Sequence, residues 1–186
     1  MKKPDMYVLK KVLVQQYLDN NKKDEAKAVL NSVIKADNKS ANSLSARVDL
    51  VKIALAENDR ATANRLLDEI FVLEPSNTDA RIQSARIKMA ENKTKDAIAD
   101  LRTAIKNDAR SLEAYRFLAV AQEKDGTQEL ALDSYYRAID IKGDDIPSIL
   151  GAARISLNLK QVDNAKKMYE HVLTLNSNNV EANFII

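Results

Sequence analysis

Small and large apolar residues recur along the chain in one local pattern. An alanine is followed by apolar residues four, seven and eight positions later, a spacing that places these side chains on one face of a helix. The pattern occurs five times; the first gap between alanines is 37 residues, and each later gap is 34. The chain is therefore predicted to contain five helical units, with anchor alanines Ala26, Ala63, Ala97, Ala131 and Ala165.

A first helix is expected ahead of each of these second helices. Polar turns such as DNNKKD at 19–24 and KDGTQ at 124–128 separate the two, and their Asn and Gly residues tolerate the left-handed backbone that ends a helix. Segments such as EPSN at 74–77 separate the units, because Pro75 cannot continue a helix. Three extra residues near 41–43 explain the longer first gap, and either a longer second helix or a longer loop would absorb them.

A helix–turn–helix unit of 34 residues resembles the tetratricopeptide repeat (TPR). The second-helix ending of that family is recognisable in ALDSYYRAIDIKGDD and in ANRLLDEIFVLEPSN. The resemblance implies an all-α fold, a right-handed TPR superhelix of five helical hairpins plus a partial sixth first helix. It divides the chain into an N-terminal extension, 1–6, and one array, with units at about 7–43, 44–77, 78–111, 112–145, 146–179 and 180–186.

The first helices depart from the family pattern at two positions. The large residue expected early in the helix is present as Tyr115 and Ile149, whereas Lys10, Arg47 and Arg81 stand there in the first three units. The glycine expected in the middle of the helix is replaced by Val14, Val51, Ala85, Ala119 and Ala153. These departures leave the exact packing of the first helices undetermined, but they do not change the predicted fold.

The chain ends on VEANFII, which reads as the first half of a sixth first helix. A solenoid normally closes with a helix whose outer face is polar. We therefore expect this sequence to be a piece of a longer repeat protein, similar to bacterial TPR proteins such as those of envelope and exopolysaccharide-export systems. The alternative is that another subunit covers the open end.

Composition and charge limit the classes of function that the sequence can support. A formal net charge of +2 gives no bulk signal for nucleic acid or membranes, and no apolar run is long enough to span a bilayer. There is no cysteine, and the single histidine, His171, lies on a second helix. Neither a phosphate-binding glycine motif nor metal-ligand spacing is present. We expect a non-enzymatic protein without cofactor or metal; cytoplasmic and periplasmic locations both remain open.

The resemblance also implies a binding surface, because the first helices of TPR hairpins line the concave side of the superhelix. The family's groove positions carry a discontinuous basic line in this sequence, with apolar and acidic residues beside it. The carboxylate clamp of chaperone-binding TPR domains is absent, since Asp49 and Asp79 stand where it needs neutral or basic groups. The candidate groove residues are Lys11, Gln15, Asp49, Lys52, Ile82, Gln83, Arg86, Arg116, Phe117, Val120 and Arg154.

Three functions remain. The preferred one is a protein–protein interaction scaffold that binds a peptide or partner segment in this groove, where basic side chains pair with carboxylates. The second is self-association into a homo-oligomer through the open C-terminal end. The third is RNA binding by a helical repeat, which the interspersed acidic residues and the single groove aromatic residue disfavour.

Overall fold

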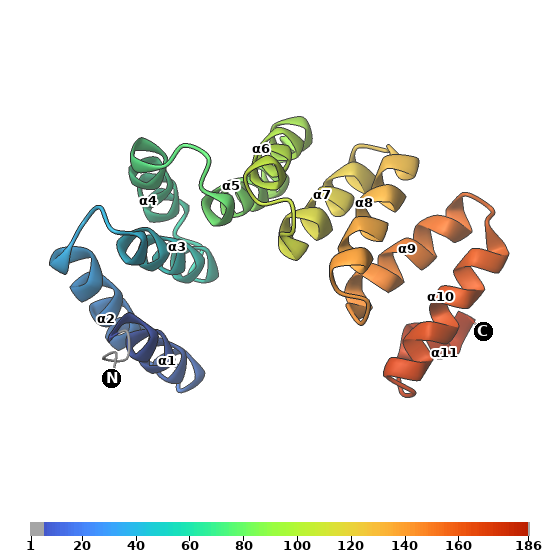
Figure 1. Cartoon of the computed structure of the whole chain (residues 1–186), viewed down its shortest axis with the longest axis horizontal. Coiled ribbons are helices and arrows are strands. Elements are labelled where there is room, and N and C mark those ends of the chain that lie inside the picture. Colours follow the sequence, from blue (N-terminus) through green and yellow to red (C-terminus); the bar gives the residue numbers. More distant parts are fainter. Residues whose placement is uncertain (1–5, 186) are drawn as a thin grey trace. The chain divides into compact units, whose positions relative to one another are not determined.

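The computed structural model describes residues 6–185, and in that range the chain forms eleven helices and no strand (Figure 1). The first helices of the hairpins are α1 (Met6–Asp19), α3 (Ala41–Ala56), α5 (Thr78–Ala90), α7 (Leu112–Lys124), α9 (Ile146–Asn158) and α11 (Val180–Ile185). The second helices are α2 (Lys23–Ala36), α4 (Arg60–Leu73), α6 (Thr94–Asn107), α8 (Gln128–Ile141) and α10 (Val162–Leu175). The predicted N-terminal extension lies outside the described residues, except for Met6, which begins α1.

The chain forms two compact units, residues 1–83 and 84–186, with the boundary inside α5. The first unit holds α1 to α4 and the beginning of α5. The second unit holds the rest of α5 and α6 to α11.

The turn inside each hairpin has the same hydrogen bond and the same backbone conformation. The N–H of the residue before each second helix donates to the carbonyl five residues earlier, as in Lys22 to Tyr17 at 2.8 Å and Thr127 to Gln122 at 2.9 Å. Ahead of each donor is one residue with positive φ, the Schellman ending of a helix. These residues are Asn21, Asn58, Asn92, Gly126 and Lys160. Four of the five are Asn or Gly, the residue types that tolerate this region best.

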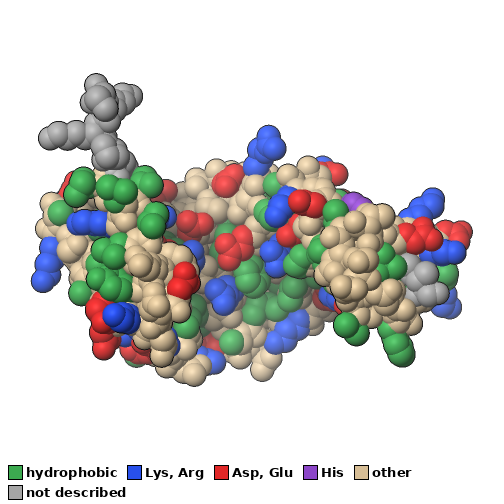
Figure 2. Space-filling model, turned by 90° about the horizontal axis from the view of Figure 1, so that it is seen from below, with side chains coloured by type: hydrophobic (Ala, Val, Ile, Leu, Met, Phe, Trp, Pro, Cys, Tyr) green, Lys and Arg blue, Asp and Glu red, His purple; other side chains and the backbone are tan. Residues whose placement is uncertain are grey.

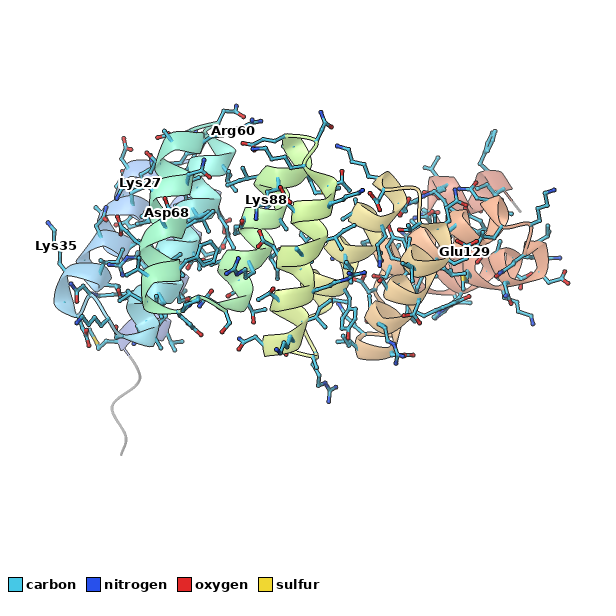
Figure 3. The ribbon with its side chains drawn as sticks, turned by 90° about the horizontal axis from the view of Figure 1, so that it is seen from above. Lys27, Lys35, Arg60, Asp68, Lys88 and Glu129 are labelled. Carbon is cyan, nitrogen blue, oxygen red and sulfur yellow. The ribbon has the colours of Figure 1, made fainter. Side chains whose placement is uncertain are left out.

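The hairpin cores follow the predicted pattern. All five anchor alanines have no exposed surface. The residues four positions later, among them Leu30, Leu101 and Tyr169, are also buried. A small residue at the anchor lets two helices approach closely, and the larger residues fill the layer beside it. The opposite face of the second helices is polar and exposed, as Arg60, Asp68 and Glu129 show (Figure 3).

The three extra residues of the first gap lie in neither of the two predicted places. Every connection between one hairpin and the next has four residues, including 37–40 and 74–77. Instead, α3 has 16 residues, whereas α5, α7 and α9 have 13 each. The first helix of the second hairpin is longer at its start, where the Ser40 hydroxyl accepts a hydrogen bond from the Ser43 N–H at 3.1 Å and caps it.

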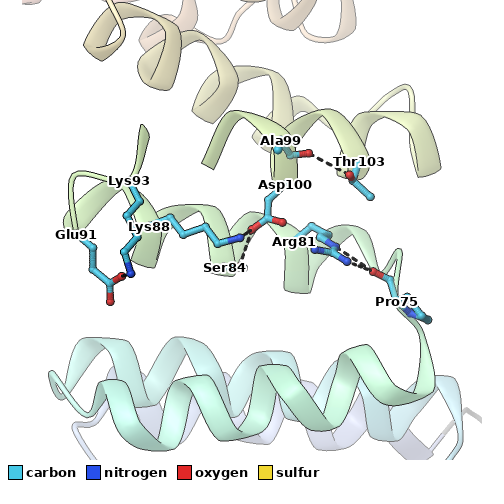
Figure 4. Close-up of polar contacts among 9 residues, drawn as sticks. All are labelled: Pro75, Arg81, Ser84, Lys88, Glu91, Lys93, Ala99, Asp100 and Thr103. Carbon is cyan, nitrogen blue, oxygen red and sulfur yellow. Dashed lines mark hydrogen bonds and ion pairs between the residues drawn. The ribbon is translucent and has the colours of Figure 1, made fainter. Parts of the chain in front are cut away.

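The cations that replace a large apolar residue in the first helices bind neighbouring polar groups instead. Arg47 is buried, and it donates to the Asn38 carbonyl and to the Glu69 carboxylate, both at 3.1 Å. Arg81 stacks on Phe71, 4.4 Å from the ring centroid, and donates to the Pro75 carbonyl at 2.6 and 2.9 Å (Figure 4). A guanidinium can thus take the place of the large residue, because it donates hydrogen bonds to the connection that precedes its helix.

Candidate partner-binding surface

A pocket of about 400 Å³ lies on the first unit, between α1 and α3. Its volume is within the range of pockets that bind small ligands or single side chains of a peptide. Helices α1 and α3 each contribute four residues at helical spacing, and α2 contributes its first residue. The lining residues are Lys11, Val14, Gln15, Leu18, Lys23, Asp49, Lys52, Ile53 and Ala56.

The pocket combines an apolar floor with a basic rim. Val14 and Ile53 are buried beneath it, while Lys11 and Lys52 are exposed. Asp49 is the one carboxylate of the lining, and it lies 3.7 Å from the Lys52 ammonium group. Three lysines and one aspartate leave an excess of positive charge around the apolar floor.

The polar contacts along the rim leave it free to rearrange. Lys11 lies over the Tyr7 ring, 5.3 Å from its centroid, and Gln15 donates to the Asp19 carboxylate at 2.7 Å. Exposed contacts of this kind contribute about 0–1 kcal/mol each, so a ligand can displace them at small cost.

The groove positions of the second unit are arranged differently, because Arg116 and Arg154 pair with carboxylates outside their own helices. Arg116 lies 3.6 Å from the carboxylate of Asp145, and Arg154 lies 3.2 Å from that of Glu181. Partial burial by itself lowers the pKa of Arg154, but the hydrogen bond to Glu181 and its charge outweigh burial, and the pKa is raised. Arg154 therefore stays charged and paired.

Aromatic residues fix the same surface of the second unit. Arg86 lies over the Phe117 ring, 5.5 Å from its centroid. The Tyr135 hydroxyl donates to Glu123, and its ring lies against Gly151, where a Cβ would overlap the ring atoms. Burial raises the pKa of Tyr135, and the Glu123 hydrogen bond and charge raise it further.

Two sequence models of the tetratricopeptide repeat match the chain, at residues 82–146 and 146–179, and together they span more than half of its 186 residues. The chain belongs to the tetratricopeptide repeat family. Both matches lie almost wholly in the second unit. A search of curated protein sequences finds no match.

Solved TPR structures have the same fold. MamA superposes with a TM-score of 0.71 at 20% identity, over 88% of this chain and 94% of that one. PilF from Pseudomonas aeruginosa gives 0.80 at 13% identity, over 95% and 79%. YrrB, described as a TPR protein with an unusual peptide-binding site, gives 0.66 at 12% identity, over 92% and 87%. These likenesses confirm the predicted all-α TPR solenoid, and at such identities they show the fold alone.

The TPR fold is typically that of a non-catalytic scaffold for protein–protein interaction. Within residues 6–185, no group of three or more His, Asp or Glu side chains lies together in a way that could hold a metal ion. Over the same residues, no helix is both long enough and apolar enough to cross a membrane.

The structure separates the predicted TPR groove residues into three sets. Lys11, Gln15, Asp49 and Lys52 meet in the first-unit pocket. Arg86, Arg116, Phe117, Val120 and Arg154 lie in the second unit, and among these Arg86, Val120 and Arg154 are exposed.

The prediction for Ile82 and Gln83 has to be corrected. Each is only 1% exposed, so neither side chain can meet a partner on the surface. The groove positions of the family are read as surface positions, but in α5 these two side chains are packed inside the protein.

Lys23 is the charged pocket residue that the sequence prediction missed. It begins α2, a second helix, and the prediction drew groove positions from first helices alone. The two consecutive lysines in the turn DNNKKD were the available signal, because a turn residue beside the end of α1 can reach the same surface. Val14, Leu18, Ile53 and Ala56 supply the apolar part of the lining.

Proposed function

We propose that this TPR protein binds an extended segment of a partner protein, and that the first-unit pocket is where the segment is held. The observation that carries the proposal is the pocket itself, with its apolar floor and three lysines around it. Extended concave surfaces are what helical-repeat proteins use for binding. The solved structure of YrrB, which is described as a TPR protein with an unusual peptide-binding site, supports peptide binding as a use of this fold.

The chemistry of the pocket indicates the kind of segment. An aliphatic side chain would cover Val14 and Ile53, which removes apolar surface from water. Carboxylates beside it would accept charge-assisted hydrogen bonds from Lys11, Lys23 and Lys52. The ligand is thus an acidic segment that carries at least one aliphatic residue.

The same reasoning gives the second-unit arginines a smaller part. Arg116 and Arg154 would have to leave Asp145 and Glu181 before they could bind a ligand carboxylate. Exchanging one carboxylate for another gains little, because the ion pair formed with the ligand replaces an ion pair lost within the protein.

Self-association through the C-terminal end is the second candidate. It is favoured by α11, where Val180 and Phe184 are exposed and Phe184 is 90% exposed. Light scattering of the Phe184→Glu variant tests it, since a dimer formed through this end would dissociate.

Labelled peptides in which a leucine is flanked by Asp and Glu test the pocket by fluorescence anisotropy, with Lys-flanked peptides as the comparison. The Lys11→Glu, Lys52→Glu variant should lose about tenfold or more in affinity for the acidic peptide. The matched control is Lys35→Glu, Lys39→Glu, because both of these lysines are exposed in the same unit and lie outside the pocket. The control should bind like the wild type, and binding should weaken with added salt.

Two results would contradict the proposal. Equal binding by the pocket variant and its control would remove the pocket from consideration. A loss of binding only in an Arg86→Glu, Arg116→Glu, Arg154→Glu variant would move the site to the second unit.

A further inference from the structure

The pocket of the first unit contains one acidic residue, Asp49, among lysines and apolar residues. Figure 2 shows hydrophobic, basic and acidic side chains close together beside the grey N-terminal residues. The Asp49 side chain is 25% exposed, and it lies 3.7 Å from the Lys52 ammonium group, which is too far for a hydrogen bond. The amide of Gln15, which lines the same pocket, donates to Asp19 instead. Among the described residues, the Asp49 carboxylate therefore has no hydrogen-bond donor.

The repeat does not require an acidic residue at this position. The residues at the position of Asp49 in the other first helices are Val12, Gln83, Phe117, Gly151 and Ile185. None of them is acidic, and in the second unit two of them take part in packing, because Phe117 lies under Arg86 and Gly151 lies against the Tyr135 ring. The packing of the hairpins thus gives no reason for an aspartate in α3.

A ligand that covers the pocket has to satisfy this carboxylate. In the free protein, water can reach the exposed quarter of the Asp49 side chain. An aliphatic side chain over Val14 and Ile53 would displace that water, and a carboxylate that loses water without gaining a donor destabilises the complex. Ligand carboxylates cannot replace the water, because they repel a like charge. The bound segment therefore needs a hydrogen-bond donor beside its aliphatic residue.

The main chain of the ligand is the donor that fits this place. Asp49 and Ile53 are four residues apart on α3, so their side chains are neighbours on one face of the helix. A ligand side chain that packs on Ile53 thus has its own main-chain N–H within reach of Asp49. A lysine or arginine of the ligand fits less well, because Lys11 and Lys52 line the same pocket and repel a further cation.

We propose that Asp49 is a specificity-determining residue of the pocket, and that its carboxylate accepts a hydrogen bond from the main-chain N–H of the aliphatic residue in the bound segment. The role of Asp49 rests on the proposed function, since it requires that the pocket binds an acidic segment. A segment bound in this way is extended at its aliphatic residue, because an N–H inside a helix already donates to a carbonyl group. Proline is excluded at that place, because it has no N–H.

Peptides with one amide replaced by an ester test the hydrogen bond, because the ester has an oxygen atom in place of the N–H. The probe is the labelled acidic peptide with a central leucine, made with either an amide or an ester at the leucine nitrogen, and its affinity is measured by fluorescence anisotropy. The ester should bind the wild type about tenfold more weakly than the amide, as expected for the loss of a hydrogen bond to a charged acceptor. Both peptides should bind Asp49→Ala with nearly equal affinity, because this variant has no carboxylate to accept the bond.

The matched control is Asp24→Ala. Asp24 pairs with a lysine three residues further on, Lys27, also at 3.7 Å, but it lies outside the pocket. This variant should discriminate between the amide and the ester as the wild type does. Circular dichroism should show that both aspartate variants keep their helices.

The role of Asp49 and the pocket proposal fail in different ways. If the wild type does not bind the amide peptide, or if Lys11→Glu, Lys52→Glu binds it like the wild type, both proposals are overturned, because the peptide does not occupy the pocket. If the lysine variant weakens binding but the wild type and Asp49→Ala discriminate equally against the ester, the pocket stands and the role of Asp49 is wrong. An ester that binds the wild type as tightly as the amide has the same meaning.

Discussion

The two units carry similar charges at their groove positions but hold them in different ways. In the first unit, Lys11 and Lys52 stand at the rim of a pocket and make loose contacts. In the second unit, Arg116 pairs with Asp145, which also accepts a hydrogen bond from the Ser148 N–H at 3.1 Å and caps α9. One repeat position can therefore line an open pocket in one hairpin and take part in internal structure in another.

The two units also differ in the side chains that lie between the two helices of a hairpin. In the first unit, Leu50, Ala54 and Leu66 form an apolar layer between α3 and α4. The same repeat positions in the hairpin of α5 and α6 are Ser84, Lys88 and Asp100 (Figure 4). Ser84 donates to the buried Asp100 carboxylate at 2.6 Å, and the Lys88 ammonium group pairs with the same oxygen.

The largest effect is expected from removing Lys88. Lys88→Met takes away a charged donor from a carboxylate that has almost no exposed surface, so the second unit should lose about 3 kcal/mol of unfolding free energy. This lies at the low end for a buried pair because Lys88 itself is partly exposed. Urea denaturation followed by circular dichroism measures it.

The apolar layer of the first unit provides the control. Ser84→Leu, Lys88→Ala, Asp100→Leu copies the residues of α3 and α4 and leaves no buried charge, so it should be at least as stable as the wild type. If the triple variant is less stable than Lys88→Met alone, the polar cluster is needed for packing and not only tolerated.

A smaller effect is expected at Gly151, which lies against the Tyr135 ring. Alanine normally stabilises a helix interior relative to glycine by about 1 kcal/mol, but here its Cβ would overlap the Tyr135 ring. Gly151→Ala should therefore destabilise the protein by about 2 kcal/mol, as overpacked cores do.

The sign should reverse when the ring is removed. In a Tyr135→Ala background, Gly151→Ala should become stabilising, because only the helix propensity remains. Thermal unfolding of the four proteins of this double-mutant cycle gives the coupling. Additive effects would mean that the Tyr135 ring moves aside freely.

The repeat period was enough to predict the hairpins, because the anchor alanines and the residues on the same face form the core of every hairpin. It did not predict the added turn of α3, since a helix of any length can begin at a capped serine such as Ser40. The roles of Arg47 and Arg81 were also not predictable, because their partners include carbonyl groups of the preceding connections, which carry no side-chain signal.

The candidate site was predictable in part for a related reason. Helical spacing places Lys11, Gln15, Asp49 and Lys52 on facing sides of α1 and α3, and these four do meet in one pocket. It does not say how deeply a side chain is buried, so Ile82 and Gln83 were misjudged. The ion pair of Arg154 with Glu181 was also not predicted, because it joins residues of two different helices, α9 and α11.

The smallest expected effect is the response of the two units to alkali. Leu30 and Leu67 in the first unit correspond to Tyr135 and Tyr169 in the second, and burial together with nearby carboxylates raises the pKa of both tyrosines. In the unfolded chain a tyrosine ionises near pH 10, whereas these two resist ionisation while folded. The unfolded state then binds fewer protons, so stability should be unaffected below about pH 10 and should fall as the pH rises above it.

Tyr135→Leu, Tyr169→Leu should flatten this part of the stability curve, whatever its effect at neutral pH, because it restores the residue type of the first unit. Urea denaturation at a series of alkaline pH values measures the slope, and the near-ultraviolet absorbance of tyrosinate shows when the hydroxyls ionise. Lysines also titrate in this range, but both proteins contain the same lysines, so their contribution cancels when the two slopes are compared. An equal slope in the two proteins would mean that the tyrosines ionise without unfolding and that the second unit is more open around Glu123 and Glu181 than its hydrogen bonds indicate.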